Sequence, residues 1–282
     1  MATALVISVP TGDVEVASDV LWSLGVRGIE ERAVDDGRVE LWTSVGDDAM
    51  AVGRAVSALG ERWPWTTVAV EDDGASTWRD FARPMWIDED LVVVPAWQPH
   101  EFGAQVTTIE IEPAGAFGLG DHPTTALSLA AVRRSITPAA NVLDVGCGTG
   151  VLAIGAALLG ARRVRAVDIA SAAVEATLDN ARRNAVADRI VVDTAPLTEI
   201  EGHHDLVVAN ILAPTLVELA EDLRRLTAPT GRLVISGILA DRHDHVVDAL
   251  APMAVERTDV LDGWAAVTLR HPGRHPGRHP GD

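Results

Sequence analysis

The chain contains no lysine and no tyrosine, and Cys147 is its single cysteine. Without lysine, the protein can form no lysine Schiff base and has no phosphate-binding P-loop lysine. A single cysteine excludes a disulfide or a thiolate metal cluster within one chain, and it favours a reducing compartment. Because no partner base is evident for Cys147, we interpret it as a small packing residue rather than a nucleophile.

Positive charge is also scarce, since 23 arginines face 41 acidic residues and the formal net charge is -18. Surfaces that bind nucleic-acid phosphate need excess positive charge, so we expect no direct nucleic-acid binding. The acidity would suit a basic protein partner, but general solubility is the simpler explanation. The sequence has no apolar run of bilayer length, no secretory signal and no metal-ligand pattern, and we expect a cytoplasmic protein without a membrane or metal partner.

The chain of 282 residues is long enough for two domains. Residues 1–72 alternate strand-like and helix-like patterns in the order βαββαβ, which predicts a small α+β, ferredoxin-like domain. Residues 73–113 are predicted to be a linker and connecting segment. The strands expected in these two regions are Ala4 to Pro10, Gly28 to Ala33, Arg38 to Thr43, Thr66 to Glu71, Leu91 to Val94 and Val106 to Glu112, and the helices are Asp13 to Leu24 and Asp47 to Leu59.

Residues 114–270 predict a second, α/β domain with a Rossmann-like, doubly wound and mainly parallel sheet. Its strands are apolar runs without alternation, as in sheets that are buried on both faces. The strands expected are Asn141 to Val145, Val164 to Asp168, Ile190 to Asp193, Asp205 to Asn210, Arg232 to Ser236 and Trp264 to Leu269. The helices expected are Val151 to Leu159, Ser171 to Asn184, Pro214 to Leu226 and Ala240 to Leu250. Residues 271–282 repeat Arg-His-Pro-Gly and are predicted to be a disordered tail.

A glycine-rich loop at residues 144–150 has the sequence Asp-Val-Gly-Cys-Gly-Thr-Gly between a predicted strand and a predicted helix. A dinucleotide site requires G-x-G-x-x-G, but here Val151 follows the third glycine. Asp144 would repel a pyrophosphate, whereas it can accept hydrogen bonds from an ammonium group. S-adenosylmethionine carries an ammonium and a sulfonium, so we expect this cofactor to bind at Asp144, Gly146 and Gly148.

Two polar residues follow later strands of the same predicted sheet. Asp168 lies about 20 residues beyond the glycine loop, at the separation that brings a carboxylate to ribose hydroxyls. Asn210 ends an apolar strand at the carboxyl edge of the sheet, where its amide can orient a nucleophilic nitrogen of the substrate. A loop-capping role is the alternative for Asn210.

The segment 117–125 has the sequence Phe-Gly-Leu-Gly-Asp-His-Pro-Thr-Thr and leads into a predicted helix with Pro123 near its first turn. Gly118 and Gly120 permit close approach of the backbone to a ligand. The polar groups at the helix start are those of His122, Thr124 and Thr125. Ordinary helix capping explains these polar residues as well as ligand binding does.

Residues 116–125, 142–150 and 207–212, with similarity at 236–239, 19–31 and 91–97, resemble the bacterial methyltransferases of large-subunit ribosomal protein eleven. The resemblance implies a class I methyltransferase domain behind a substrate-recognition domain, and S-adenosylmethionine-dependent methylation of lysine side chains and an N-terminal amine of that ribosomal protein. It also implies site roles. The residues implied to enclose the cofactor and the target amine are Phe117, Gly118, His122, Thr124 and Thr125. A cofactor contact is implied for Gly146 and Asp168, and an active-site contact for Asn210.

On this basis the expected catalytic residues are His122, Thr125 and Asn210, and Phe117, Gly118, Thr124, Thr125 and Asn210 join the glycine loop in binding the cofactor. The chain departs from the family at Leu119, where a threonine is usual, and so lacks a hydroxyl beside the expected transfer centre. Two alternatives stay open. One is a methyltransferase of the same fold for another protein or a small molecule, and the other is a non-catalytic regulator that binds S-adenosylmethionine.

Overall fold

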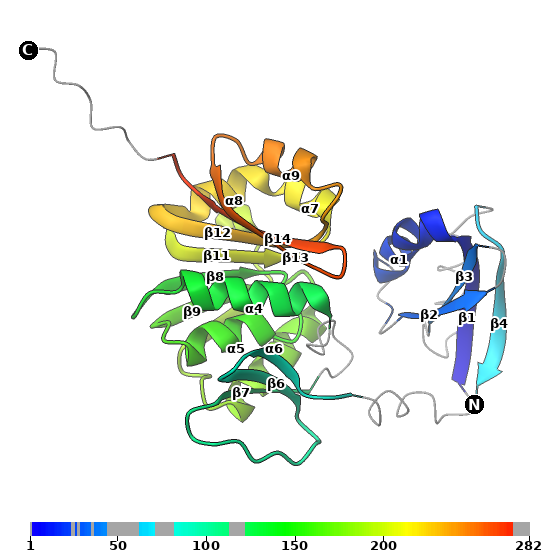
Figure 1. Ribbon diagram of the computed structural model, residues 1–282, viewed down its shortest axis with the longest axis horizontal. Coiled ribbons are helices and arrows are strands. Elements are labelled where there is room, and N and C mark those ends of the chain that lie inside the picture. Colours follow the sequence, from blue (N-terminus) through cyan, green and yellow to red (C-terminus); the bar gives the residue numbers. More distant parts are fainter. Residues whose placement is uncertain are drawn as a thin grey trace, which may run out of the picture. The chain divides into compact units, whose positions relative to one another are not determined.

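A computed structural model describes residues 2–23, 26, 29–34, 37–43, 62–70, 82–112 and 122–272. The chain divides into two compact units, Met1–Ala82 and Arg83–Asp282. The strands of each unit form sheets of their own (Figure 1). The buried hydrophobic residues likewise form separate core clusters in the two units. Within the described residues, no helix is both long and apolar enough to cross a membrane.

The N-terminal unit is built on a four-stranded antiparallel sheet of order β2-β3-β1-β4. Its elements are β1 (Ala2–Pro10), η1 (Thr11–Asp13), α1 (Val14–Ser23), β2 (Ile29–Val34), β3 (Arg38–Thr43) and β4 (Trp65–Val70). Alternate residues of β1, Leu5, Ile7 and Val9, are buried in one cluster with Leu21 and Leu41. The described elements agree with the predicted βαββαβ order, and the second predicted helix, Asp47 to Leu59, lies outside the described residues.

The C-terminal unit contains a seven-stranded sheet of order β10-β9-β8-β11-β12-β14-β13. Its strands are β8 (Asn141–Val145), β9 (Arg163–Val167), β10 (Ile190–Asp193), β11 (His204–Asn210), β12 (Thr227–Leu239), β13 (Ala254–Leu261) and β14 (Trp264–Arg270). The first five strands in that order are parallel, whereas β14 is antiparallel to β12 and β13. The strand order reverses between β8 and β11, and open α/β sheets bind ligands at such a reversal, beyond the carboxyl ends of the strands.

Both faces of this sheet are covered by helices. The helices are α4 (Pro123–Ser135), α5 (Val151–Leu158), α6 (Ser171–Arg183), α7 (Ala213–Glu218), α8 (Ala220–Leu226) and α9 (Asp244–Ala249), with the 3-10 turn η2 at Leu197–Glu199. Val142 and Val208 belong to the core cluster that includes residues of α4, α5 and α6. Their neighbours Leu143 and Val207 belong to the cluster with residues of α7, α8 and α9. Burial on both faces explains why these strands are continuously apolar.

A smaller sheet belongs to the same unit and is formed by β5 (Met85–Asp88), β6 (Leu91–Pro95) and β7 (Thr107–Ile111). Asn180 of α6 and Asn184, the residue that caps the end of α6, bind the backbone of β7 and the residue after it. Asn184 accepts from Glu110 N at 2.9 Å and donates to Glu110 O at 2.7 Å, and Asn180 makes the same two bonds to Glu112 at 2.9 Å each. Asn180 also donates to Thr149 O, at 3.0 Å, within the glycine-rich loop.

Several predicted elements were wrong in extent. The helix expected at 214–226 consists of α7 and α8, which meet at Leu219, and the helix expected at 240–250 covers only 244–249. The strands β5 and β13 were missed. β13 is exposed along nearly all of its length and carries Glu256, Arg257 and Asp259. It therefore lacks the apolar pattern by which strands are recognised in a sequence.

The two asparagines lead to a stability prediction. Asn184→Ala would leave Glu110 N and Glu110 O without the bonds that the amide supplies. We expect this variant to lower the free energy of unfolding by about 1–3 kcal/mol. The exposed neighbour Arg183 provides the control, since Arg183→Ala is expected to change stability by no more than about 0.5 kcal/mol. Urea denaturation of both variants tests the difference, and equal midpoints would contradict the structural role of Asn184.

Candidate active site

The glycine-rich loop joins β8 to α5 at the carboxyl edge of the sheet. Gly146, Gly148 and Gly150 have φ values of 73°, 53° and 82°, a region that favours glycine over residues with a Cβ. A Cβ on Gly146 would lie 2.3 Å from Cγ2 of Ile211, and one on Gly150 would lie 2.8 Å from Cγ2 of Thr177. The loop is therefore closely packed against its neighbours, and its conformation requires these glycines.

The end of β9 holds the loop through backbone and side-chain bonds. Gly146 N and Cys147 N both donate to Val167 O, at 2.8 and 3.1 Å. Gly148 N donates to Asp168 Oδ2 at 2.9 Å, and Ala170 N donates to Asp168 Oδ1 at 3.0 Å. A carboxylate has further lone pairs, so the half-buried Asp168 can accept additional hydrogen bonds from a ligand. The structure thus places Asp168 directly beside the loop, as the sequence predicts.

Asp144 lies under the loop and has no exposed surface. Its Oδ2 accepts a 3.0 Å hydrogen bond from Ala153 N in α5, whereas Oδ1 has no hydrogen-bond partner among the described residues. Burial, and to a smaller degree the charge of Asp168, raises the pKa of Asp144 from its ordinary value of 3.8 to about 7, despite the opposing bond from Ala153. The negative charge beneath the loop is therefore held at a cost to the protein's stability.

Cys147 is buried within the same loop. The Thr177 hydroxyl donates to Cys147 Sγ at 3.4 Å and to Gly148 O at 3.1 Å. Burial, together with the nearby charge of Asp144, strongly raises the pKa of the Cys147 thiol. A thiol that does not ionise is a poor nucleophile, which supports the interpretation of Cys147 as a packing residue. Among the described residues, no group of three or more His, Cys, Asp or Glu side chains could hold a metal ion.

Asn210 is the last residue of β11 and is half-buried at the same edge. It lies opposite Ser236 of β12, and the next residue, Ile211, donates from its backbone N to Ser236 O at 3.2 Å. The Ile211 side chain is the one that Gly146 packs against. Asn210, the glycine loop and Asp168 are therefore brought together by the ends of β11, β8 and β9.

His122, Thr124 and Thr125 lie at the start of α4. His122 is the N-cap, and its Nδ1 accepts from Thr124 N at 3.3 Å and lies 2.8 Å from Thr124 Oγ1. Thr125 is buried, and its backbone N donates to His122 O at 2.9 Å. These contacts supply the capping role that the sequence allowed. Phe117 and Gly118, like Leu119, lie outside the described residues.

The sequence did not single out Trp264, whose ring contacts His122 with centroids 5.0 Å apart and planes at 70°. Thr177 and Asn180, which bind the loop from α6, were also missed. Only one signal was available for Trp264, its place after the turn-forming pair Asp262-Gly263. Polar residues buried inside a helix give no sequence signal of the backbone groups they bind.

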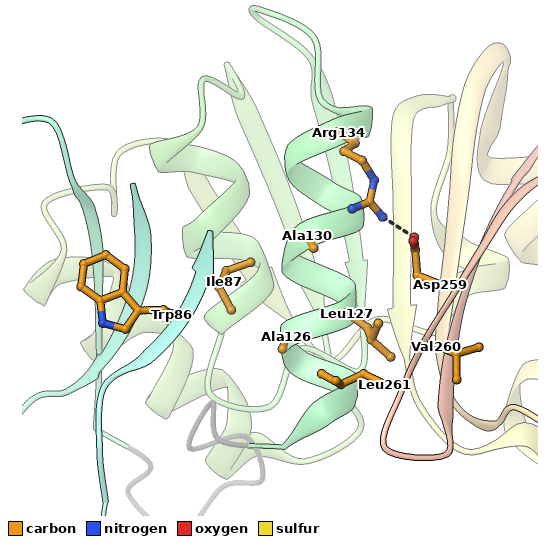
Figure 2. A pocket seen from close by; sticks show the side chains of 9 residues that line it. All are labelled: Trp86, Ile87, Ala126, Leu127, Ala130, Arg134, Asp259, Val260 and Leu261. Atoms are coloured by element: carbon orange, nitrogen blue, oxygen red, sulfur yellow. Dashed lines mark hydrogen bonds and ion pairs between the residues drawn. The ribbon is translucent and has the colours of Figure 1, made fainter. Parts of the chain in front are cut away.

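A separate groove of about 260 Å³ lies over α4, between β5 and the β13–β14 hairpin (Figure 2). Ala126, Leu127 and Ala130 form its floor, and Arg134 of α4 pairs with Asp259 of β13. Trp86 lines the groove from β5 and is 48% exposed. The groove contains none of the residues predicted to be catalytic or to bind the cofactor.

Comparisons with known proteins agree on one family. The family model described as ribosomal protein L11 methyltransferase (PrmA) matches residues 43–272. The chain is 40% identical over 200 residues to the ribosomal protein L11 methyltransferase of Exiguobacterium sp., an alignment that covers 70% of this chain and 64% of that protein. It is 36% identical over 270 residues to the protein of that name from Symbiobacterium thermophilum, with 93% and 84% covered.

A solved structure is also similar, that of a ribosomal protein L11 methylase from Lactobacillus delbrueckii subsp. bulgaricus. The TM-score is 0.64 and the sequence identity 29%, and the match covers 68% of this chain and all of that chain. The shared fold includes the doubly wound sheet predicted from the sequence. The matched part of the present chain spans slightly less than two thirds of the Exiguobacterium protein.

The buried Asp144 leads to a prediction for stability against pH. Because its folded-state pKa is raised, its contribution to stability is complete below about pH 4 and is lost as the pH rises to about 7. Asp144→Asn cannot ionise, so the variant should gain stability relative to the parent over this interval, by a few kcal/mol. Denaturant unfolding of both proteins at several pH values, without ligand, measures the gain. A stability difference that is independent of pH would contradict the assigned cause.

Proposed function

The chain belongs to the ribosomal protein L11 methyltransferase family, and from this premise we propose that it methylates amino groups of ribosomal protein L11 with S-adenosylmethionine. The observation that carries the proposal is the convergence of the glycine loop, Asp168 and Asn210 at one edge of the sheet. The matching family model, which spans residues 43–272, supports the same activity. The proposed targets are lysine side chains and the N-terminal amine.

The residues at this edge fit the cofactor. Glycines at 146 and 148 leave only backbone at the surface of the loop, which allows close approach of a ligand. The half-buried Asp168 carboxylate has lone pairs for ribose hydroxyls. In its ionised form Asp144 adds negative charge behind the loop, which suits a ligand that carries an ammonium and a sulfonium. We assign cofactor binding to Asp144, Gly146, Gly148, Asp168 and Asn210, joined by Phe117, Gly118, Thr124 and Thr125.

When bound, S-adenosylmethionine supplies an electrophilic methyl group, and attack by an amine nitrogen displaces a neutral thioether. The protein's part is to position the two reactants and to exclude water. The Asn210 amide is suited to orient the amine, since it ends β11 beside the loop. His122 and Thr125 hold the segment at the start of α4, and the amine proton leaves to solvent.

The N-terminal unit is assigned to substrate recognition. We keep the domain limits 1–72 for this part, 73–113 for the connecting segment, 114–270 for the methyltransferase domain and 271–282 for the tail as part of the proposal. The net charge of -18 favours a protein partner over nucleic acid. A cytoplasmic location accompanies a ribosomal substrate, and no membrane partner is proposed.

The cofactor assignment predicts a loss of affinity in Asp168→Ala. Hydrogen bonds to a charged group contribute about 1.5–3 kcal/mol, so S-adenosylmethionine should bind roughly 10- to 100-fold more weakly. Calorimetric titration measures the change, and Asp168→Asn separates the lost charge from the lost bond to Gly148. Asp179→Ala on the exposed side of α6 is the matched control and should bind like the parent. Unchanged affinity in both Asp168 variants would rule out the assignment.

The substrate assignment predicts that purified protein transfers labelled methyl groups to isolated ribosomal protein L11. Arginine-rich ribosomal proteins other than L11 should take up little label in parallel reactions, which controls for nonspecific methylation of basic proteins. Label on another protein or on a small molecule would support a different substrate. Cofactor binding without any transfer would support a non-catalytic regulator.

A further inference from the structure

Trp264 occupies the carboxyl edge of the main sheet, close to the proposed transfer site. It is the first residue of β14 and follows the turn Asp262-Gly263, whose φ values are 49° and 82°. Because β14 is antiparallel to β12, its first residue lies at the edge where β8, β9 and β11 end. The strand partner of Trp264 is Leu239, the last residue of β12. The side chain is half-buried, so part of the indole can meet a ligand.

The end of β12 connects this tryptophan to the residue after Asn210. The register of β12 with β14 shifts between Ile235 and Ile238, and irregularities of this kind often re-aim side chains next to active sites. Gly237, with φ 83°, lies so close to Ile211 that an added Cβ would be 2.4 Å from Ile211 O. The β12–β14 pair is therefore packed directly on the segment that carries Asn210.

Trp264 also contacts His122, in an edge-to-face arrangement with 5.0 Å between ring centroids. His122 in turn caps α4 and binds Thr124. Trp264 is thus linked to the Asn210 segment through β12 and to His122 by a direct ring contact. The proposed function assigns orientation of the target amine to Asn210, and the family resemblance implies that His122 helps to enclose it.

We propose that Trp264 is a specificity-determining residue that binds the target amino group and its methylated forms through the face of the indole ring. The inference rests on the proposed function and adds a contact for the side chain that is methylated. Tryptophan attracts ammonium groups more strongly than the other aromatic residues, and methylated ammonium ions are recurrent ligands of aromatic rings. An indole ring accepts no proton, so Trp264 holds and orients the amine without acting as a base.

This contact favours repeated methylation of one amine. Each added methyl group makes the cation larger and more weakly hydrated, so less water must be removed when it meets the ring. A partly methylated lysine is therefore retained better than an unmodified one, and higher methylation states accumulate. A tryptophan that only packed against His122 would show no preference for a cation over a neutral group of the same shape.

The test compares Trp264→Leu and Trp264→Phe with the parent, and uses Trp86→Leu as the matched control. Trp86 is more exposed than Trp264 and lines the separate groove over α4, so its replacement tests the effect of losing an accessible indole away from the site. Calorimetry measures binding of two short peptides from ribosomal protein L11, one with trimethyllysine and one with its neutral all-carbon isostere. We expect Trp264→Leu to weaken the binding of the cationic peptide about 3- to 30-fold and that of the neutral peptide less than about twofold. Trp264→Phe should lie between, and Trp86→Leu should match the parent.

Product analysis supplies a second measurement. Mass spectrometry of L11 after many turnovers should show a smaller share of trimethylated product for Trp264→Leu than for the parent, with S-adenosylmethionine affinity unchanged. Equal weakening of the cationic and neutral peptides would overturn the inference, because it would indicate packing alone. If Trp264→Leu does not fold, the Trp264→Phe comparison of the two peptides decides. Failure of the parent to methylate L11 would defeat the proposed function, while the peptide comparison would still report on Trp264.

Discussion

The hydrogen bond from Gly148 N to Asp168 fixes the relation between the loops that follow β8 and β9. Val167 O supports the same junction by accepting from Gly146 and Cys147. Because backbone groups of one loop bind both the main chain and the side chain of the other, neither can move alone. The Asp168 carboxylate is therefore positioned before any ligand arrives, and a preorganised site spends less free energy on ordering when it binds.

Beneath the same junction, the ionised form of the buried Asp144 side chain is unfavourable. Asp144 is fully buried with only one of its carboxyl oxygens bonded in the described part of the chain, and its pKa is raised to about 7. A structure selected for stability alone would have an uncharged residue there. The carboxylate accepts a hydrogen bond from Ala153 N in α5, and its charge also favours a ligand that is positive near the loop, such as a cofactor with a sulfonium and an ammonium. Ionisation of Asp144 thus lowers the stability of the fold while it favours a positively charged ligand.

Much of this arrangement could be predicted from the sequence, because its determinants are local. The limits of β8 and β10 agree with the prediction, since apolar runs bounded by polar residues mark buried strands. The position of Asp168 follows from its distance along the chain from the glycine loop. The place of Asn210 at this edge could be predicted because it ends an apolar strand, and the ends of parallel strands meet at one edge of a sheet.

The remaining features depend on contacts between residues far apart in the sequence. Nothing near Asn180 indicates that it binds Thr149 and Glu112. Likewise, the contact between Trp264 and His122 arises from the packing of β14 beside α4. The strand β13 was missed for a different reason. Its charges keep it soluble at the border of the sheet, and those charges remove the apolar alternation by which strands are found.

Asn180 of α6 and its C-cap residue Asn184 affect how copies of the protein can associate. β7 is the last strand of the small sheet, and such a strand normally presents unpaired amides and carbonyls to any passing chain. Asn184 and Asn180 occupy those groups at Glu110 and Glu112, as a neighbouring strand would. The two asparagine side chains therefore block the addition of another strand at Glu110 and Glu112, and with it aggregation that would begin there.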